Sequence, residues 1–350
     1  MAENNIAGNN IAGNNTAENN IAVIGAGPVG SIAAAYLARS TGHPKSSVTV
    51  IEPYYSAHTK KIASDGLSLK NDDDTPHMKE CVAPVNGIFS LSELQTIPNI
   101  IIIATKAFVL KDVVTQLKRR FSNREREDIT FVCMQNGYKN EVFLSDQLRT
   151  NVCRVAVNYV GNITSPGEVS GHWLKIPNYI GAAYPHIDNK AEELADLLNS
   201  VGLYTEFIKD IRPATFLKTI LNAALSPVCA ATKKTMKEAM DDEKLCEIVK
   251  QTLLESLGVA EAIGFRYNSE QANIDVLMSY LRAGGNHPSS MRLDLLRGDK
   301  TEIEWINGAI VREGRKYGVE TSLNSRLVGI INTLERSSTS AREEVYRILN

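Results

Sequence analysis

The segment that most constrains the fold of this chain is NIAVIGAGPVGSIAAAYL, residues 20–37, in which a short apolar run leads into the spacing Gly-x-Gly-x-x-Gly. Gly25 allows a tight turn, Gly27 lets a ligand approach the backbone, and Gly30 lets a following helix pack close to the strand. A purely structural glycine turn is the alternative, but a second apolar strand follows on schedule at residues 48–51. The pattern predicts the first βαβ unit of a dinucleotide-binding domain.

This unit indicates a nicotinamide or flavin cofactor. The free N–H groups at the start of a helix, together with the helix dipole, favour a phosphate anion. We therefore expect the pyrophosphate to lie against the loop formed by Gly25, Ala26, Gly27, Pro28, Val29 and Gly30.

Composition is ordinary for a globular enzyme and excludes several other classes of protein. The 350 residues are enough for about two domains. A net charge of −2 gives no reason to expect nucleic acid or an anionic membrane as partner. The longest apolar runs are too short to span a bilayer, and no signal peptide is expected. Five scattered cysteines without a Cys-x-x-Cys pair indicate thiols in a reducing cytosol and argue against a metal site.

Along the chain we expect three parts. Residues 1–18 are an Asn-rich repeat of the strand-entry sequence, with too little apolar surface to fold alone. Residues 19–210 alternate strand and helix, which predicts a mostly parallel, doubly wound sheet of Rossmann type. Residues 211–350 have the pattern of long amphipathic helices, which predicts an all-helical domain with Pro213 in the first turn of its first helix.

The elements expected in these two domains follow from apolar periodicity. Strands are predicted at 20–25, 48–52, 99–104, 129–134 and near 203–208, with a mixed or antiparallel extension of the sheet over 152–184. Helices are predicted at 29–40, 108–121, 140–148, 189–201, 214–231, 241–263, 269–282, 299–317 and 323–335. An active site is expected in the cleft between the domains, at the carboxyl ends of the strands.

Two polar residues follow predicted strands at that edge. Lys106 comes after strand 99–104, where it can bind a phosphate or a carboxylate or remain a solvated loop lysine. Asn136 comes after strand 129–134 and offers both a donor and an acceptor, although on the pattern alone a turn residue before glycine is the better explanation.

The helical region contributes further candidates. Lys218 and Asn222 lie four residues apart and share a helix face. Among apolar neighbours Lys218 is either snorkelling or partly buried, and burial would lower its pKa into the range of a useful proton donor. Glu302 near a predicted helix start has a competing explanation, since Asp299 or Thr301 would cap that helix and an acidic residue suits its first turn.

Together these segments resemble the ketopantoate reductase (2-dehydropantoate 2-reductase) family over about residues 20–335. The resemblance rests on five segments in order: GAGPVG, TKAF, QNG, LKTILNAALSPVCA and SSMRLDLLRGDKTEIEWING. It implies a Rossmann domain followed by a helical domain, and the reduction of 2-dehydropantoate to (R)-pantoate in pantothenate and coenzyme A synthesis. It also implies that Lys218 is the general acid and that Glu302 orients and tunes the site. Asn222 and Ser290 would bind substrate polar groups, and Lys106 and Asn136 would lie between cofactor and substrate.

Two positions depart from the family pattern. Ser226 stands where an Asn often precedes the proline, so recognition of the substrate hydroxyl is expected to differ and another branched 2-keto acid is an alternative substrate. Glu52 ends the second strand where many members have a basic residue. A carboxylate there accepts hydrogen bonds from the ribose of NAD and repels the 2′-phosphate of NADP, so NAD(H) is expected to be preferred. Lys60 and Lys61 are near enough in sequence to rescue NADP(H) binding.

The partner expected is thus a small-molecule 2-keto acid. A dinucleotide-binding sensor without turnover is the alternative from another class of protein, and the proton donor expected in the cleft argues against it. An apolar helix of the second domain can serve as core or as the face of a homodimer.

Overall fold

The computed structural model describes residues 19–39, 47–52, 54, 56–71, 78–174, 177–184, 189–268 and 273–337, together with Arg342 and Tyr346. The predicted repeat tail, residues 1–18, lies outside these ranges.

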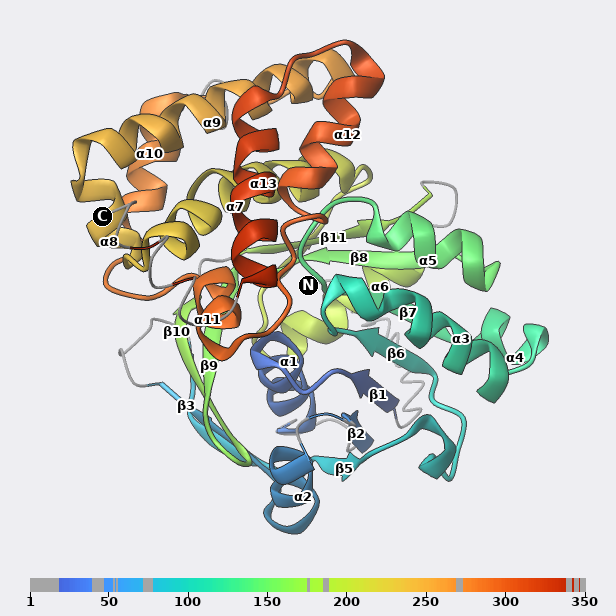
Figure 1. The fold of residues 1–350 in the computed structure, drawn as a ribbon. Helices are drawn as coiled ribbons and strands as arrows, with labels where there is room; N and C mark the ends of the chain where they lie inside the picture. The colour runs from blue at the N-terminus through green and yellow to red at the C-terminus, as the bar shows by residue number, and fades with distance from the viewer. Residues whose placement is uncertain are drawn as a thin grey trace, which may run out of the picture.

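An eight-stranded sheet in the order β12-β11-β8-β7-β6-β1-β2-β5 forms the centre of the N-terminal domain (Figure 1). Its strands are β1 (Asn20–Ile24), β2 (Ser47–Ile51), β5 (Asn86–Ile88), β6 (Ile100–Ile103), β7 (Thr130–Cys133), β8 (Val152–Ala156), β11 (Asn178–Ala182) and β12 (Thr205–Phe207). Neighbours run parallel except β8 and β11, which are antiparallel. The chain moves from β1 to β2 on one side and later returns to β6 on the other, which makes the end of β1 the switch point where α/β proteins bind ligands.

Helices cover both faces of this sheet because its strands are apolar on both sides. Ile21 and Val23 pack on the face covered by α1 (Pro28–Ala38) and α6 (Asn189–Ser200). Ala22 and Ile24 pack on the other face, under α3 (Leu110–Arg120) and α5 (Asn140–Leu148). The short helices α2 (Ser56–Asp65) and α4 (Asn123–Asp128) and the 3₁₀ turns η1 (Leu91–Glu93) and η2 (Ala107–Val109) complete the domain. The predicted doubly wound sheet is confirmed.

The mixed extension predicted over residues 152–184 is confirmed for β8 and β11, but a second sheet corrects the rest of that prediction. Strands β9 (Tyr159–Ser165) and β10 (Glu168–Leu174) do not extend the main sheet. They join β3 (Leu67–Lys70) and β4 (Cys81–Ala83) in a four-stranded sheet of order β4-β3-β10-β9. Helix α1 packs against strands of both sheets. The β-rich pieces expected at 152–159, 167–174 and 179–182 match β8, β10 and β11, whereas β9 was not predicted. The pattern of a strand carries no information about which sheet the strand joins.

The remaining chain is helical and gathers on one side of the main sheet (Figure 1). Its helices are α7 (Arg212–Thr232), α8 (Met236–Asp241), α9 (Glu243–Ile263), α10 (Ile274–Arg282), α11 (Ser290–Arg297), α12 (Asn307–Tyr317) and α13 (Ser322–Arg336). Pro213 lies in the first turn of α7, as predicted. Within the described chain, α7 alone is long and apolar enough to cross a membrane, and most of it is buried in the helical core.

The helix predicted at 299–317 begins only at Asn307, so the first part of that prediction is wrong. Gly298, at φ +78°, ends α11, and turns fill the interval to α12. Thr301 does not cap α12, whose N-cap is Ile306. Its N–H and hydroxyl both donate to Glu335 on α13 instead. Helices α8 and α11 were not predicted.

Candidate active site

A cleft of about 2110 Å³ lies where the carboxyl ends of the main-sheet strands face the helical domain. Eleven of the residues predicted to act line it: Gly27, Pro28, Val29, Glu52, Lys106, Asn136, Lys218, Asn222, Ser226, Ser290 and Glu302. Gly25, Ala26 and Gly30 do not line the cleft but shape the loop that borders it. One cavity therefore receives both the predicted cofactor residues and the predicted substrate residues.

The glycine loop has room for a pyrophosphate where a side chain would otherwise stand. Gly25 has φ +104°, and a Cβ there would lie 2.8 Å from the backbone nitrogen of Thr105. A Cβ on Gly30 would lie 2.1 Å from the carbonyl oxygen of Gly25. A Cβ on Gly27 would meet nothing within 4 Å, so the space beside the N-terminus of α1 is open. Because no side chain caps that helix, its first N–H groups can bind phosphate oxygens.

Glu52 ends β2 and is tied to this loop. Its Oε2 accepts a hydrogen bond of 3.2 Å from the N–H of Ala26, and its Oε1 accepts one of 2.8 Å from the N–H of Tyr54. The carboxylate is buried yet borders the cleft. This is the position from which an acidic residue after the second strand reaches a ribose.

Lys106 crosses from the main sheet to the helical domain. Its Nζ lies 2.6 Å from Oδ2 of Asp294 on α11 and 3.8 Å from Oε2 of Glu302. Burial disfavours the ammonium, but the carboxylates of Glu302 and Asp294 outweigh that effect and raise the pKa of Lys106. Lys106 is therefore a paired cation rather than a solvated loop lysine.

Glu302 lies in the turns before α12 rather than at the start of a helix. Its Oε1 accepts a hydrogen bond of 2.9 Å from the N–H of Ala107, and its side chain is buried. The capping explanation is therefore wrong, since the N-cap of α12 is Ile306. Glu302 instead binds the turn that carries Lys106.

Asn136 borders the cleft in the turn after β7. Its carbonyl oxygen accepts a hydrogen bond of 2.7 Å from Asn140 Nδ2, which ties the turn to α5. The preceding Gln135 donates to the carbonyl oxygen of Thr105 at 2.9 Å, and so joins the turns that follow β6 and β7. The sequence did not single out Gln135, although it belongs to the QNG segment.

Lys218, Asn222 and Ser226 follow one another at intervals of four on the cleft face of α7. The ammonium of Lys218 donates a hydrogen bond to the carbonyl oxygen of Val157, just beyond β8. The pKa of Lys218 is lowered to about 7, chiefly by burial and further by the charge of Arg154, while the charge of Glu302 partly opposes both effects. Lys218 is thus partly buried rather than snorkelling.

Helix α11 brings Ser290 to the same region. Its N-cap residue Ser289 donates to the carbonyl oxygen of Ser226 at 3.2 Å and accepts from the N–H of Arg292 at 3.2 Å. The start of α11 is therefore hydrogen-bonded to α7 next to Lys218, Asn222 and Ser226. Hydroxyl and amide groups converge here with an amine of lowered pKa, an arrangement that can bind a small polar substrate and give it a proton.

Sequence reasoning missed two charged residues at this site, Asp294 and Arg154. Both are buried. The signal available was a charged residue within an apolar stretch, Leu293 to Leu296 for the first and strand β8 for the second.

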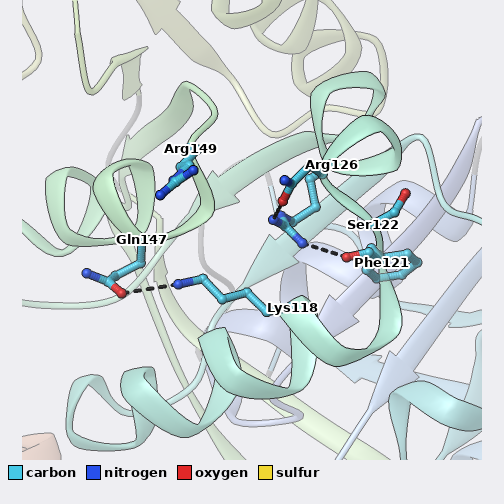
Figure 2. A pocket seen from close by; sticks show the side chains of 7 residues that line it. Lys118, Phe121, Ser122, Arg126, Gln147 and Arg149 are labelled. Atoms are coloured by element: carbon cyan, nitrogen blue, oxygen red, sulfur yellow. Dashed lines mark hydrogen bonds between the residues drawn. The ribbon is translucent and has the colours of Figure 1, made fainter.

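A second pocket, of about 430 Å³, lies near the ends of α3 and α5 and shares no lining residue with the cleft. Figure 2 shows the side chains that line it. Arg126 donates there to the carbonyl oxygens of Phe121 and Leu148, which end these two helices. Lys118 and Arg149 are also close to helix C-termini, where cations are stabilised by the helix dipole. This group of cations neutralises two helix ends, so we assign it a structural role.

No group of three or more His, Cys, Asp or Glu side chains able to hold a metal ion occurs in the described part of the chain. All five cysteines are free.

Two family profiles match the chain. "Ketopantoate reductase PanE/ApbA" covers residues 21–181, and "Ketopantoate reductase PanE/ApbA C terminal" covers residues 210–335. A curated 2-dehydropantoate 2-reductase from Pyrococcus horikoshii is 25% identical over 323 residues, which are 89% of this chain and 96% of the relative.

Solved structures have the same fold. A PanE/ApbA family ketopantoate reductase from Ralstonia eutropha superposes with a TM-score of 0.78 at 23% identity, covering 93% of this chain and 99% of the other. A D-mandelate dehydrogenase solved with NADH and anilino(oxo)acetate gives a TM-score of 0.75 at 23% identity, with the same coverage. The profile matches extend over most of the chain and include the glycine loop, helix α7 with Lys218, and the turns that carry Glu302. This chain therefore belongs to the ketopantoate reductase family of nicotinamide-dependent oxidoreductases.

Proposed function

We propose that this protein reduces 2-dehydropantoate to (R)-pantoate, a step of pantothenate and coenzyme A synthesis, with Lys218 as the proton donor. One observation carries the proposal: Lys218 and Gly27 line the same cleft, and the pKa of this lysine is lowered to about 7. A general acid works best when its pKa is near the working pH.

The residues of the cleft divide the reaction among them. A bound nicotinamide supplies the hydride, which goes to the 2-keto carbon. As the carbonyl π pair moves onto oxygen, the ammonium of Lys218 stabilises the growing negative charge and transfers its proton to that oxygen. The resulting amine regains a proton from solvent. Asn222, Ser226 and Ser290 hold the substrate's polar groups, and Asn136 stands between substrate and cofactor.

Glu302 has two functions in this proposal. Its charge opposes the lowering of the pKa of Lys218, which keeps part of that lysine protonated near neutral pH. Its hydrogen bond to the N–H of Ala107 also fixes the turn that carries Lys106.

We propose NADH as the preferred cofactor, because the carboxylate of Glu52 borders the cleft at the end of β2. Lys60 and Lys61, on α2, do not support a 2′-phosphate, since neither lines the cleft and Lys61 pairs with Asp65 at 2.7 Å. Because the five cysteines are free thiols, we also propose that the enzyme works in the reducing cytosol.

The test is the initial rate of NADH and NADPH oxidation with 2-dehydropantoate, for the wild type, Lys218→Ala and Lys244→Ala. Lys244 is an exposed lysine on α9 and serves as the matched control. We expect Lys218→Ala to lose about 10³-fold in kcat and Lys244→Ala to keep the wild-type rate. Equal rates for both variants would rule out Lys218 as the acid. A wild type that binds NADH but reduces no keto acid would favour a sensor without turnover.

Ser226 supports a second candidate substrate, another branched or bulky 2-keto acid. Its hydroxyl is shorter than the amide common at this position, and the D-mandelate dehydrogenase that shares the fold was solved with a bulky keto-acid analogue. A panel of 2-keto acids separates the candidates. If Ser226→Asn raises kcat/KM for 2-dehydropantoate but lowers it for bulkier acids, the native substrate is a bulkier acid.

A further inference from the structure

Strand β8 carries an arginine where an apolar side chain is expected. Arg154 is 1% exposed, and its guanidinium reaches three neighbouring segments. Nη2 donates to the carbonyl oxygen of Gly137 at 3.0 Å, Nη1 lies 2.9 Å from Sγ of Cys133, and Nε lies 3.7 Å from Oε2 of Glu141. The side chain therefore binds the backbone of the turn that carries Asn136, a residue that lines the cleft.

The charge of Arg154 is only partly neutralised. A guanidinium stays protonated in proteins, so burial does not remove its charge. Glu141 on α5 is its counter-ion, but at 3.7 Å this contact is longer than a charge-assisted hydrogen bond. Neither carboxylate oxygen of Glu141 has a hydrogen-bond partner among the described residues. A buried cation with one loose partner leaves a positive field in its surroundings.

Lys218 lies within that field. Its ammonium donates to the carbonyl oxygen of Val157, which is three residues beyond Arg154 along the same chain segment. Helix α7 packs against β8, so the two cations come from elements that are in direct contact. The other charge that acts on Lys218 is the carboxylate of Glu302, before α12. Glu302 in turn lies 3.8 Å from the ammonium of Lys106, which pairs with Asp294.

We propose that Arg154 is a positioning residue that acts on the reaction without touching substrate or cofactor. Its charge makes Lys218 a stronger proton donor, and its planar fork holds the turn at Gly137 so that Asn136 faces the cleft. The inference rests on the proposed function for the role of Lys218 as acid. The pKa of Lys218 supports it, because the charge of Arg154 lowers that pKa in addition to burial.

The turn that Arg154 binds is also restricted by its own backbone conformation and by close contacts with the helical domain. Gly137 has φ +92°, and a Cβ there would lie 2.6 Å from the carbonyl oxygen of Trp305. Tyr138 follows and packs edge-on against Phe216 of α7, with ring centroids 4.7 Å apart. The turn is thus contacted both by Arg154 of β8 and by residues of the helical domain.

Three variants separate charge from shape. Arg154→Met keeps the length of the side chain and loses its charge, whereas Arg154→Lys keeps the charge and loses the fork. Glu141→Gln removes the counter-ion and leaves Arg154 less neutralised. Each variant is compared with the wild type in two assays. One is the pH profile of kcat for keto-acid reduction with NADH. The other is the pH dependence of acetylation of the Lys218 amine by acetic anhydride, followed by peptide mass spectrometry.

The proposal predicts opposite shifts of the titration midpoint. For Arg154→Met we expect it to move up by roughly one pH unit or more, because a neighbouring positive charge is gone. For Glu141→Gln we expect it to move down, and for Arg154→Lys we expect it to stay while KM rises. A merely structural role would loosen the site in all three variants and move the midpoints together.

Two results would overturn the proposal. They are an unmoved midpoint in folded Arg154→Met and a shift in the same direction for Glu141→Gln and Arg154→Met. If Arg154→Met does not fold, the downward shift in Glu141→Gln and the unchanged midpoint in Arg154→Lys decide the question. The acetylation assay needs no turnover. If the wild type reduces no keto acid but these midpoints still shift in opposite directions, the proposed function fails and the effect of Arg154 on Lys218 stands.

Discussion

Lys106 and Asp294 form an ion pair of 2.6 Å that joins the turn after β6 to helix α11, across 188 residues of sequence. Burial raises the pKa of Asp294 even with Lys106 beside it, so the carboxylate depends on this lysine to keep its charge. Arg297 makes a second contact of 2.6 Å with Asp294. The two residues thus line the cleft and also link the N-terminal domain to the helical domain.

Replacing Lys106 by Met should therefore destabilise the protein in a pH-dependent way. Asp294 keeps only Arg297, which is half exposed, and we expect a loss of about 1–3 kcal/mol in urea unfolding at neutral pH. The loss should shrink as the pH is lowered, because burial raises the pKa of Asp294 and protonation of its carboxylate removes the unpaired charge. Lys237→Met, which breaks an exposed pair with Asp241, should change neither the free energy of unfolding nor its dependence on pH. A loss that is independent of pH would contradict the ion-pair explanation.

The glycine loop offers a matched pair of substitutions that differ in what they damage. In Gly30→Ala the new Cβ would lie 2.1 Å from a backbone oxygen, so we expect about 2 kcal/mol or more of destabilisation. In Gly27→Ala the Cβ meets nothing within 4 Å. That variant should unfold like the wild type but bind NADH roughly tenfold or more weakly, because the methyl occupies the pyrophosphate's space. Urea unfolding and fluorescence titration measure the two effects, and unchanged NADH affinity in Gly27→Ala would mean that the pyrophosphate lies elsewhere.

The lowered pKa of Lys218 fixes the direction of two pH effects. Keto-acid reduction should fall as pH rises through about 7, since only the protonated amine can give a proton. The folded pKa lies below the ordinary value of 10.5, so the unfolded chain binds the proton more tightly. Stability should therefore rise with pH between about 7 and 10.5, and the gain should be absent in Lys218→Met. Parallel stability curves for the two proteins would show that the amine titrates normally.

Removing the charge of Glu52 should weaken discrimination between the two nicotinamide cofactors. In Glu52→Gln the amide no longer repels a 2′-phosphate, and we expect the ratio of kcat/KM for NADPH to that for NADH to rise by roughly tenfold. Glu80→Gln, an exposed carboxylate outside the cleft, should leave the ratio unchanged. A wild type that already prefers NADPH would disprove the argument from Glu52.

The sequence was most informative where function depends on local spacing. The glycine loop and its flanking strand could be predicted because turn, phosphate contact and helix packing all act within a few residues. Lys218 and Asn222 could be assigned to one face because four residues make about one helical turn.

It was least informative where a side chain is fixed by a distant partner. Glu302 was taken for a residue near a helix start, but its carboxylate binds the N–H of Ala107, 195 residues away, and the local chain forms turns. Asp294 pairs with the distant Lys106 as well as with Arg297 of its own helix, and the partners of Arg154 come from other elements. Strand β10 agrees with the β-rich piece expected at 167–174 but lies in a second sheet, because strand propensity does not specify a neighbour.

Helix α1 lies between the two sheets, and Gly30 to Leu37 are almost fully buried. Its amides cannot exchange with solvent unless the sheets separate, so they should be among the slowest to take up deuterium. NADH binding at the start of α1 should barely change their exchange, since these residues are already almost fully buried between the two sheets. The capacity to bind a dinucleotide and the integrity of the N-terminal domain should then disappear in a single cooperative transition.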